Sequence, residues 1–301
     1  MDQLRFDGRV AIVTGAGRGI GRAYARLLAA RGASVVVNDL GGSMEGEGTD
    51  AGPAADAVAE IEAAGGAAAA STDDVSTPDG AAALVETAVE RFGRIDVLVN
   101  NAGIMRWAGM PEVDAEQLAQ HLAVHVGGSF NTTRAAWPHM VEQQYGRIVM
   151  TTSTGMFGLP ANTAYATAKA GVVGLTRSVN AAGKKHGIKI NLIAPAAFTR
   201  MAGQADDGGA AEARMPPDFV APMVAYLAHE DCPVSGEIYT AGAGRFARLF
   251  IASTDGYVHR DGEPTVEDVV EHWAAINDET GYFVPTDLMD WSAAFTAHLP
   301  S

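Results

Sequence analysis

Short apolar runs recur along the first 240 residues of the chain. Residues 9–14 (RVAIVT), 34–38 (SVVVN) and 96–99 (DVLV) are rich in valine and isoleucine, and glycine, aspartate or asparagine follows each run at once. Continuous runs of this kind are typical of strands buried on both faces of a parallel sheet. Further strands are predicted at residues 67–71, 147–152, 189–194 and 236–240, which gives about seven strands in all.

Segments with the apolar period of a helix lie between these strands. They cover residues 22–31, 54–64, 78–92, 114–140, 165–186 and 218–227. Strands and helices that alternate in this way predict an α/β fold, a Rossmann-type doubly wound parallel sheet with helices on both faces. We expect one dinucleotide-binding and catalytic domain over residues 1–245.

The remaining residues, 246–301, are expected to form a C-terminal extension with a helix at residues 265–276. This extension is expected to pack on the same domain or on a neighbouring subunit. Residues 201–217 contain three glycines and show no clear period. A loop of that length is usually functional or disordered, and this one could close over a substrate.

Composition narrows the possible partners. The net charge is −15 and no run of Lys or Arg is present, which argues against nucleic acid as a partner. Cys232 is the single cysteine, so no intrachain disulfide can form, and without a Cys/His cluster no metal is expected. We find no secretion signal and no apolar stretch long enough to span a bilayer, so we expect a cytoplasmic protein without a membrane partner.

A glycine-rich turn directly follows the first predicted strand. Gly15, Gly19 and Gly21 have the spacing G-x-x-x-G-x-G, and Arg18 and Ile20 lie inside the turn. Glycines let the backbone approach a pyrophosphate, whose charge is then stabilised at the N-terminus of the following helix. Because the turn joins a buried strand to a helix, it predicts a dinucleotide site.

Asp39 follows the second predicted strand and indicates which dinucleotide binds. A carboxylate at this position accepts hydrogen bonds from the adenosine ribose hydroxyls and repels a 2′-phosphate, which favours NAD over NADP. Arg18 is the opposing signal, because a basic side chain in the turn could bind that phosphate. Asp39 is given more weight, since its carboxylate would lie closest to the 2′ position.

Two further strand ends supply candidate contacts for the cofactor. Asp74 and Val75 follow the third predicted strand, where the carboxylate could bond the adenine amino group and the valine could pack nearby. Asn101, Ala102 and Gly103 follow the fourth strand, where small and amide residues let the chain pass close to a ribose while bonding it. Ligands in sheets of this type bind outside these strand ends.

Residues with catalytic potential follow the fifth predicted strand. Tyr165 and Lys169 are four positions apart, so a helix presents both side chains on one face. A fixed ammonium favours phenolate and would lower the pKa of the phenol from its usual value of about 10. A hydroxyl at Ser153 could hold the substrate oxygen while the phenol takes or gives its proton. Thr152 and Ser153 point to opposite faces of the strand, so only one of them can serve.

These parts jointly resemble the short-chain dehydrogenase/reductase family over about residues 6–245. The resemblance rests on TGAGRGIG at residues 14–21, NNAG at 100–103, and the serine and Y-x-x-x-K at 153–169. It implies that Tyr165 donates or accepts the proton, that Ser153 holds the substrate oxygen, and that Lys169 binds the nicotinamide ribose and lowers the tyrosine pKa. Tyr165 and Lys169 are both also expected to contact the cofactor. The family serine usually stands thirteen residues before the tyrosine, where this chain has Thr152; we prefer Ser153 as the serine at the strand end.

The resemblance also implies contacts to the nicotinamide end from the backbone of Ile193, from Pro195 and from Thr199. His125 stands where many members have an asparagine whose backbone holds a water in a proton relay, so His125 is a candidate for that role. The alternative is a histidine that faces solvent or a subunit contact. The family pairs subunits through helices equivalent to residues 114–137 and 165–179, which implies a homodimer or homotetramer.

A narrower resemblance is to the dehydrogenase module of peroxisomal multifunctional β-oxidation enzymes and its bacterial stand-alone relatives. It rests on VVNDLGG at residues 36–42, VHVGGSFNTTRAAW at 124–137, NLIAPAAFTRM at 191–201 and VAPMVAYLAHE at 220–230. That group oxidises (3R)-3-hydroxyacyl-CoA to 3-ketoacyl-CoA with NAD, which makes an acyl-CoA thioester the expected substrate.

Two alternatives remain open at the level of the sequence. One is a hydroxysteroid or steroid side-chain CoA dehydrogenase, and the other is a non-catalytic NAD-binding sensor or scaffold. The acyl-CoA hypothesis also carries a difficulty, because a net charge of −15 should repel an anionic thioester. Arginines such as Arg106, Arg200 or Arg248 would have to screen it.

Overall fold

The computed structural model describes residues 3–199, 213–260 and 262–299. The chain divides into two compact units, Met1–Arg248 and Leu249–Ser301. This division lies three residues beyond the expected end of the first domain at residue 245. Arg200 and most of the predicted substrate loop at residues 201–217 lie outside the described residues.

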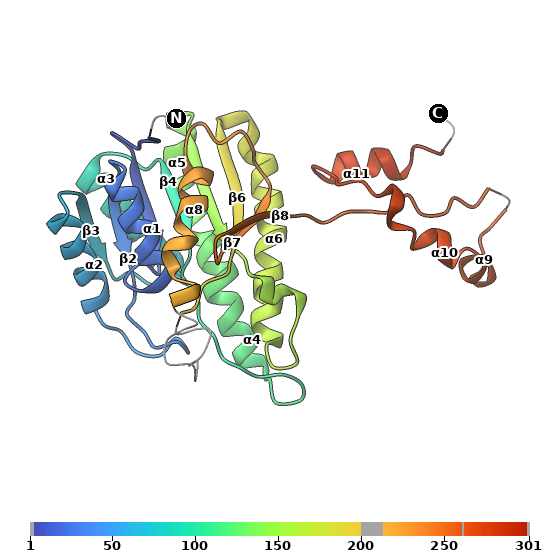
Figure 1. Cartoon of the computed structure of the whole chain (residues 1–301), viewed down its shortest axis with the longest axis horizontal. Coiled ribbons are helices and arrows are strands. Elements are labelled where there is room, and N and C mark those ends of the chain that lie inside the picture. The colour runs from blue at the N-terminus through green and yellow to red at the C-terminus, as the bar shows by residue number, and fades with distance from the viewer. Residues whose placement is uncertain (1–2, 200–212, 261, 300–301) are drawn as a thin grey trace. The chain divides into compact units, whose positions relative to one another are not determined.

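The first unit is built on an eight-stranded sheet with the order β3-β2-β1-β4-β5-β6-β7-β8 (Figure 1). Its strands are β1 (Val10–Thr14), β2 (Ser34–Asn38), β3 (Ala67–Ser71), β4 (Val97–Asn100), β5 (Gly146–Thr151), β6 (Ile188–Pro195), β7 (Ile238–Gly242) and β8 (Arg245–Leu249). All six pairings from β3 to β7 are parallel, as the continuous apolar runs predict. The order reverses between β1 and β4, and ligands bind in such sheets outside the carboxyl ends at that point. The predicted Rossmann-type fold is confirmed.

The eighth strand, β8, makes the predicted count of about seven one too low. Its sequence, RFARL, has no buried residue, because it lies at the edge of the sheet. A strand at the edge needs no continuous apolar run, which was the pattern used to predict the others.

Helices cover both faces of the sheet (Figure 1). On one face, α1 (Gly19–Ala30) contacts both α2 (Gly52–Ala63) and α8 (Ala221–Ala228). On the other, α3 (Pro78–Phe92) contacts α5 (Gly128–Gln143), and α6 (Thr163–Gly183) packs on β5 and β6. The core under α1 includes the fully buried Leu28, Val37 and Val99. Burying a side chain of this size stabilises the fold by about 1.5–3 kcal/mol.

The predicted helix at residues 114–140 is not one regular helix. It consists of α4 (Ala115–His121), a π-helix η1 (Leu122–Gly127) and α5. π-helical turns are rare and often occur at functional sites. The apolar pattern predicted one continuous helix and did not resolve this turn, which is only six residues long.

Other element boundaries also differ from the prediction. The segment at residues 165–186 forms α6 and then a 3-10 turn η3 (Lys184–His186), and that at 218–227 forms a 3-10 turn η5 (Pro217–Phe219) and then α8. Pro195 was expected to interrupt the sixth strand, but it is the last residue of β6 and pairs with Ala241. A proline is tolerated there because it ends the strand.

The second unit contains short helices, which are α9 (Val266–Glu271), α10 (Trp273–Ile276), a 3-10 turn η6 (Glu279–Gly281) and α11 (Leu288–Phe295). The single helix predicted at residues 265–276 is thus two helices separated at His272. Thr265 and Asp268 form a capping box that begins α9. The sequence analysis did not predict α11.

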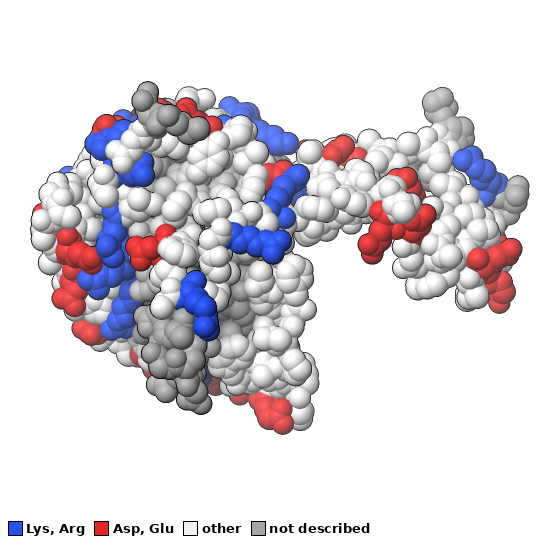
Figure 2. Space-filling view, in the orientation of Figure 1, with Lys and Arg blue, Asp and Glu red and all other residues white. Residues whose placement is uncertain are grey.

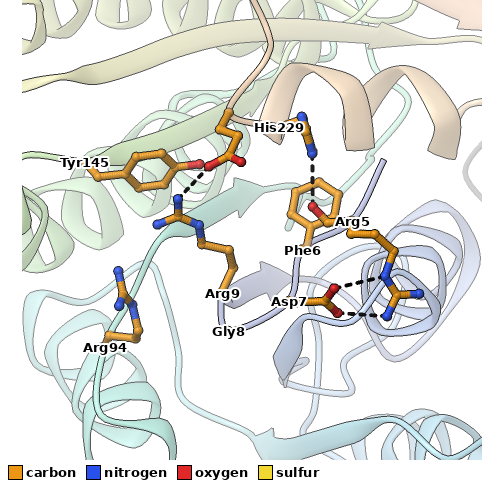
Figure 3. A pocket seen from close by; sticks show the side chains of 9 residues that line it. Arg5, Phe6, Asp7, Gly8, Arg9, Arg94, Tyr145 and His229 are labelled. Atoms are coloured by element: carbon orange, nitrogen blue, oxygen red, sulfur yellow. Dashed lines mark hydrogen bonds and ion pairs between the residues drawn. The ribbon is translucent and has the colours of Figure 1, made fainter. Parts of the chain in front are cut away.

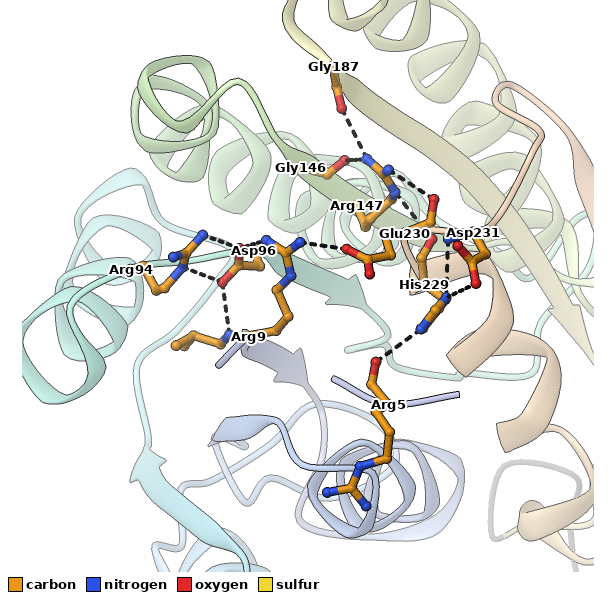
Figure 4. A network of polar contacts seen from close by, with 11 residues as sticks. Arg5, Arg9, Arg94, Asp96, Gly146, Arg147, Gly187, His229, Glu230 and Asp231 are labelled. Atoms are coloured by element: carbon orange, nitrogen blue, oxygen red, sulfur yellow. Dashed lines mark hydrogen bonds and ion pairs between the residues drawn. The ribbon is translucent and has the colours of Figure 1, made fainter. Parts of the chain in front are cut away.

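A network of charged groups holds the amino ends of the strands, at the edge opposite the switch point (Figure 4). The fully buried carboxylate of Asp96 accepts hydrogen bonds from Arg94 Nε and Nη2 at 2.8 and 2.7 Å and from Arg9 Nη1 at 3.0 Å. Arg147 donates to backbone carbonyls there, including that of Gly187 at 3.0 Å. A cavity of about 270 Å³ opens beside this network (Figure 3), but Arg9 and Arg94 at its wall are already paired.

On the face shown in Figure 2, basic side chains are scattered among acidic ones and do not form a continuous basic surface. Across the described residues, no helix has both the length and the apolar character needed to cross a membrane.

Candidate active site

A cavity of about 500 Å³ lies at the carboxyl ends of the strands near the switch point. Twelve of the fifteen predicted cofactor residues line it: Gly15, Arg18, Gly19, Ile20, Gly21, Asp39, Asp74, Val75, Asn101, Ala102, Gly103 and Thr199. The other three, Tyr165, Lys169 and Pro195, are not among the lining residues. One cavity therefore gathers residues from five separate segments of the sequence.

Two glycines of the turn adopt a backbone conformation that favours glycine. Gly15 and Gly19 have φ values of +62° and +54°, which other residues rarely adopt. A Cβ on Gly19 would have only Thr199 Cγ2 near it, at 3.7 Å, so a side chain here would project into open space beside the lining of the cavity. α1 begins at Gly19, and the N-terminus of a helix stabilises a bound phosphate. This cradle fits the pyrophosphate of a dinucleotide.

The buried carboxylate of Asp39 lies at the end of β2 and is held by backbone donors. Gly17 N donates to Oδ2 at 2.9 Å and Gly41 N donates to Oδ1 at 2.8 Å. Each oxygen keeps a lone pair that can accept a ribose hydroxyl. Arg18, the opposing signal, is directed toward the acidic loop after β2, where Nη1 donates to Gly42 O at 3.4 Å and Nη2 lies 3.9 Å from Asp50.

Asn101 contacts the glycine turn through its side chain. Its Nδ2 donates to Thr14 O at 2.9 Å and to Gly15 O at 3.1 Å. Thr14 Oγ1 in turn accepts from the backbone N–H groups of Asn101 and Ala102 at 2.9 and 3.0 Å. The amide expected to bond a ribose therefore joins the ends of β1 and β4. Thr14 was not predicted as a site residue, although it directly precedes the turn.

The structure brings together the three residues with catalytic potential. Ser153 follows the end of β5, and its hydroxyl and the Tyr165 ring from α6 both lie against Gly155, where a Cβ would be 3.2 Å from Ser153 Oγ and 2.9 Å from Tyr165 Cε1. Thr152 is fully buried and donates from Oγ1 to Lys169 O at 2.8 Å, which ties β5 to α6. Of the two neighbouring hydroxyls, the one on Ser153 therefore faces the phenol, and the one on Thr152 is structural.

The electrostatics of Tyr165 and Lys169 differ from the expectation. Burial raises the pKa of Tyr165, and the hydrogen bond from Ser153 only partly offsets this. The Lys169 ammonium lies 5.6 Å from the Tyr165 ring centre and donates to Thr151 O at 2.8 Å. Burial lowers the pKa of Lys169 to about 7. The net direction of the Tyr165 pKa in this structure is therefore upward, because desolvation dominates, and the lowering of that pKa by Lys169 stays a prediction.

The buried lysine should make the fold more stable as the pH rises. Its pKa is depressed from the unfolded value of about 10.4, so between about pH 7 and pH 10 the unfolded chain binds more protons. The free energy of unfolding should rise by about 1–2 kcal/mol between pH 7 and pH 9, and we expect Lys169→Met to remove this rise. Urea unfolding of both proteins at the two pH values measures it. An equal change in the free energy of unfolding of the two proteins would show that the rise does not come from Lys169.

His125 lies in η1 with its ring buried and its edge against the Tyr165 ring, at a centroid distance of 5.4 Å. Its Nε2 lies 2.9 Å from Ile104 O, and its backbone carbonyl accepts from Ser129 Oγ at 2.7 Å. The solvent-facing alternative does not hold for this side chain. Its relay role stays a prediction. The spacing H-x-x-x-H in HLAVH also places His121 beside it, a residue the sequence analysis missed.

A model of the short chain dehydrogenase family matches residues 9–208. The chain belongs to this family. As a short-chain dehydrogenase it is an oxidoreductase that acts on CH–OH groups. Within the described parts of the chain, no group of three or more His, Cys, Asp or Glu residues is placed to hold a metal ion.

Its relatives include stand-alone proteins and longer ones. The Mycobacterium tuberculosis protein Rv0148, a short-chain type dehydrogenase/reductase by name, is 44% identical over 91% of this dehydrogenase and 95% of its own length. Mouse peroxisomal multifunctional enzyme type 2 is 43% identical over 95% of this chain, but that match spans only 39% of the mouse protein. The Drosophila melanogaster enzyme of that name has a solved structure with a TM-score of 0.82 and 34% identity, over 98% of this chain and 50% of that one.

Proposed function

We propose that this dehydrogenase oxidises the hydroxyl of a (3R)-3-hydroxyacyl-CoA to the 3-ketoacyl-CoA, with NAD as the acceptor. The observation that carries the reaction is the placement of Ser153 beside Tyr165, with the buried Lys169 one turn along α6. The acyl-CoA substrate is supported by the relatives named as multifunctional and hydratase-dehydrogenase-epimerase enzymes. This chain spans well under two thirds of those proteins, so the substrate is inferred from only part of each.

In the proposed mechanism, bound NAD supplies the acceptor for the hydride. Ser153 holds the substrate oxygen, and Tyr165 takes the hydroxyl proton as that oxygen becomes a carbonyl. Because burial raises the pKa of Tyr165, oxidation should be favoured as the pH rises and the reverse reduction as it falls. Lys169, with a pKa of about 7, can exchange a proton near neutral pH and has an ammonium able to bond ribose hydroxyls.

The experiment is steady-state formation of NADH with a panel of both enantiomers of 3-hydroxyacyl-CoAs, hydroxysteroids, steroid side-chain CoA esters and free secondary alcohols. We expect turnover with the (3R)-hydroxyacyl-CoAs. Turnover of free alcohols or steroids without any acyl-CoA would remove the proposed substrate and keep the reaction. Tight NAD binding with no turnover of any compound would favour the sensor or scaffold.

Asp39→Ala should weaken the preference for NAD over NADP. The variant loses the carboxylate that can bond the ribose hydroxyls and repel a 2′-phosphate, so we expect the ratio of kcat/KM for the two cofactors to fall about ten- to a hundredfold. Asp56→Ala, an exposed aspartate on α2, is the matched control. An unchanged ratio in Asp39→Ala would show that this carboxylate does not select the cofactor.

We also propose that the enzyme is a homodimer or homotetramer. Phe130 on α5 is 48% exposed and Leu122 in η1 is 36% exposed, which leaves apolar side chains on the helices expected to pair subunits. Light scattering in solution measures the mass, and a monomer at all concentrations would exclude this proposal.

A further inference from the structure

The three residues after Gly103 contact the loop at residues 43–47, part of which lines the cavity. Ile104 and Met105 are buried, and Met105 N donates to Met44 O at 2.9 Å. Arg106 donates from Nε to Glu45 O and from Nη2 to Glu47 Oε1, both at 3.0 Å. Since Ser43 and Gly46 of the same loop line the cavity, residues 104–106 hold the loop over the cofactor site.

Two histidines hold these three residues from the other side. Arg106 N donates to His121 Nε2 at 3.3 Å, and His125 Nε2 lies 3.3 Å from Ile104 N and 2.9 Å from Ile104 O. The two rings are stacked, with centroids 6.0 Å apart and planes 20° apart. The π-helical turn η1 begins immediately after His121 and contains His125.

We propose that His121, together with His125, is a positioning residue of the active site. The pair, called here the histidine clamp, holds residues 104–106 against the loop at residues 43–47, and the ring of His125 also packs against the ring of Tyr165. The clamp therefore influences cofactor affinity through the loop, and it influences the position of the Tyr165 phenol through the ring of His125. Neither histidine contacts the substrate. The part that concerns Tyr165 rests on the proposed function, whereas the part that concerns the loop does not.

The clamp requires a neutral His121 in one tautomer. Its Nδ1 lies 2.7 Å from Gln117 O and donates to it, so Nε2 must be bare to accept from Arg106 N. A second proton on Nε2 would face that N–H group and break the contact. The charged groups that act on His121 are Arg106 and Lys169, and the ring of His125 is stacked on it. Burial first, and then the positive charges of Arg106 and Lys169, lower its pKa, so the clamp is kept at neutral pH and lost as the pH falls below the usual histidine range.

His125 shows a second feature of the clamp. Its single Nε2 can bond Ile104 N or Ile104 O but not both, and its Nδ1 is buried without a partner in the structure. A Cβ on Gly103 would lie 2.5 Å from His125 Cε1 and 3.0 Å from Nδ1, so the ring packs directly against the lining of the cavity. An amide side chain could satisfy both groups of Ile104, and His125→Asn should therefore keep residues 104–106 in place.

The test compares His121→Phe, which keeps a ring but no acceptor, with His121→Gln, whose amide oxygen can accept from Arg106 N but does not titrate. The readouts are hydrogen–deuterium exchange of the peptides that cover residues 43–47 and 104–106, and NAD affinity by calorimetry. In His121→Phe we expect about tenfold faster exchange of residues 104–106 and several-fold weaker NAD binding. His121→Gln should restore both, and His139→Phe on α5 is the control that should change neither.

Acid pH separates the clamp from a merely structural histidine. As the pH falls below the usual histidine range, the wild type should lose protection of residues 104–106, whereas His121→Gln should keep it. Equal acid sensitivity in the two proteins, or unchanged exchange in His121→Phe, overturns the proposal. If His121→Phe does not fold, the acid comparison of wild type and His121→Gln still decides. If the exchange and affinity results hold but no alcohol is oxidised, the clamp stands and the proposed function fails.

Discussion

Tyr165→Phe should lower kcat by about a hundredfold to ten-thousandfold and leave the affinity for NAD almost unchanged, because it removes only the group that transfers the proton. The phenol lies beside the side chain of Ser153, against Gly155. Steady-state kinetics with the best substrate of the panel, together with calorimetry for NAD, measures both quantities.

Tyr24→Phe is the matched control for this substitution. Tyr24 is also buried, but its hydroxyl has no hydrogen-bond partner in the structure and belongs to the core beneath α1. Its loss should therefore leave turnover intact. A Tyr165→Phe enzyme that turns over at the wild-type rate would show that another group moves the proton.

Gly21→Ala should abolish measurable NAD binding at ordinary cofactor concentrations. A Cβ at this position would lie 2.2 Å from Gly15 O and 2.6 Å from Asn101 Nδ2, so the turn and the joint between β1 and β4 must move apart. Overpacking of this kind costs about 1–3 kcal/mol of stability, and it displaces the backbone that forms the cradle. We expect NAD affinity to fall by about a hundredfold or more, since binding depends on the N–H groups of that backbone.

Gly174→Ala provides the comparison for Gly21→Ala. Gly174 lies inside α6, and a Cβ there would meet no atom within 4 Å. The substitution should stabilise the helix by about 0.5–1 kcal/mol and leave cofactor binding unchanged. NAD binding by Gly21→Ala at wild-type affinity would mean that the turn does not hold the pyrophosphate.

The sheet could be predicted because its parallel strands are buried on both faces. The runs at residues 9–14 and 34–38 carry this burial in their composition, whereas the edge strand β8 does not. The π-helical turn η1 was not predicted, because six residues are too few to show a change of apolar period. The end of strand–helix alternation gave residue 245 as the expected end of the first domain. In the structure the first unit ends three residues later, at Arg248.

The twelve predicted cofactor residues that line the cavity could be placed from the sequence because each lies in a segment that follows a strand, and parallel strands end at one edge. What each side chain bonds was less accessible. The side-chain amide of Asn101 donates hydrogen bonds to the carbonyls of Thr14 and Gly15. Burial raises the pKa of Tyr165 although Lys169 lies one helical turn away. Both depend on packing between segments far apart in the sequence, which spacing alone does not describe.

The arginines considered for an anionic thioester are largely engaged. Arg106 pairs with Glu47 at 3.0 Å, and Arg248 pairs with Glu237 at 2.6 Å. A CoA ester would have to compete with these carboxylates. Activity with acyl-CoA should therefore be tested at more than one ionic strength, because added salt weakens repulsion between exposed charges.

The buried carboxylate of Asp96, with its two arginines, has a consequence for how the molecule can change over time. It anchors the end of the sheet farthest from the chemistry, so the loops at the reactive end need not also secure the strands. Those loops are left open to variation in length and sequence. New substrate preferences can therefore arise there without loss of the scaffold.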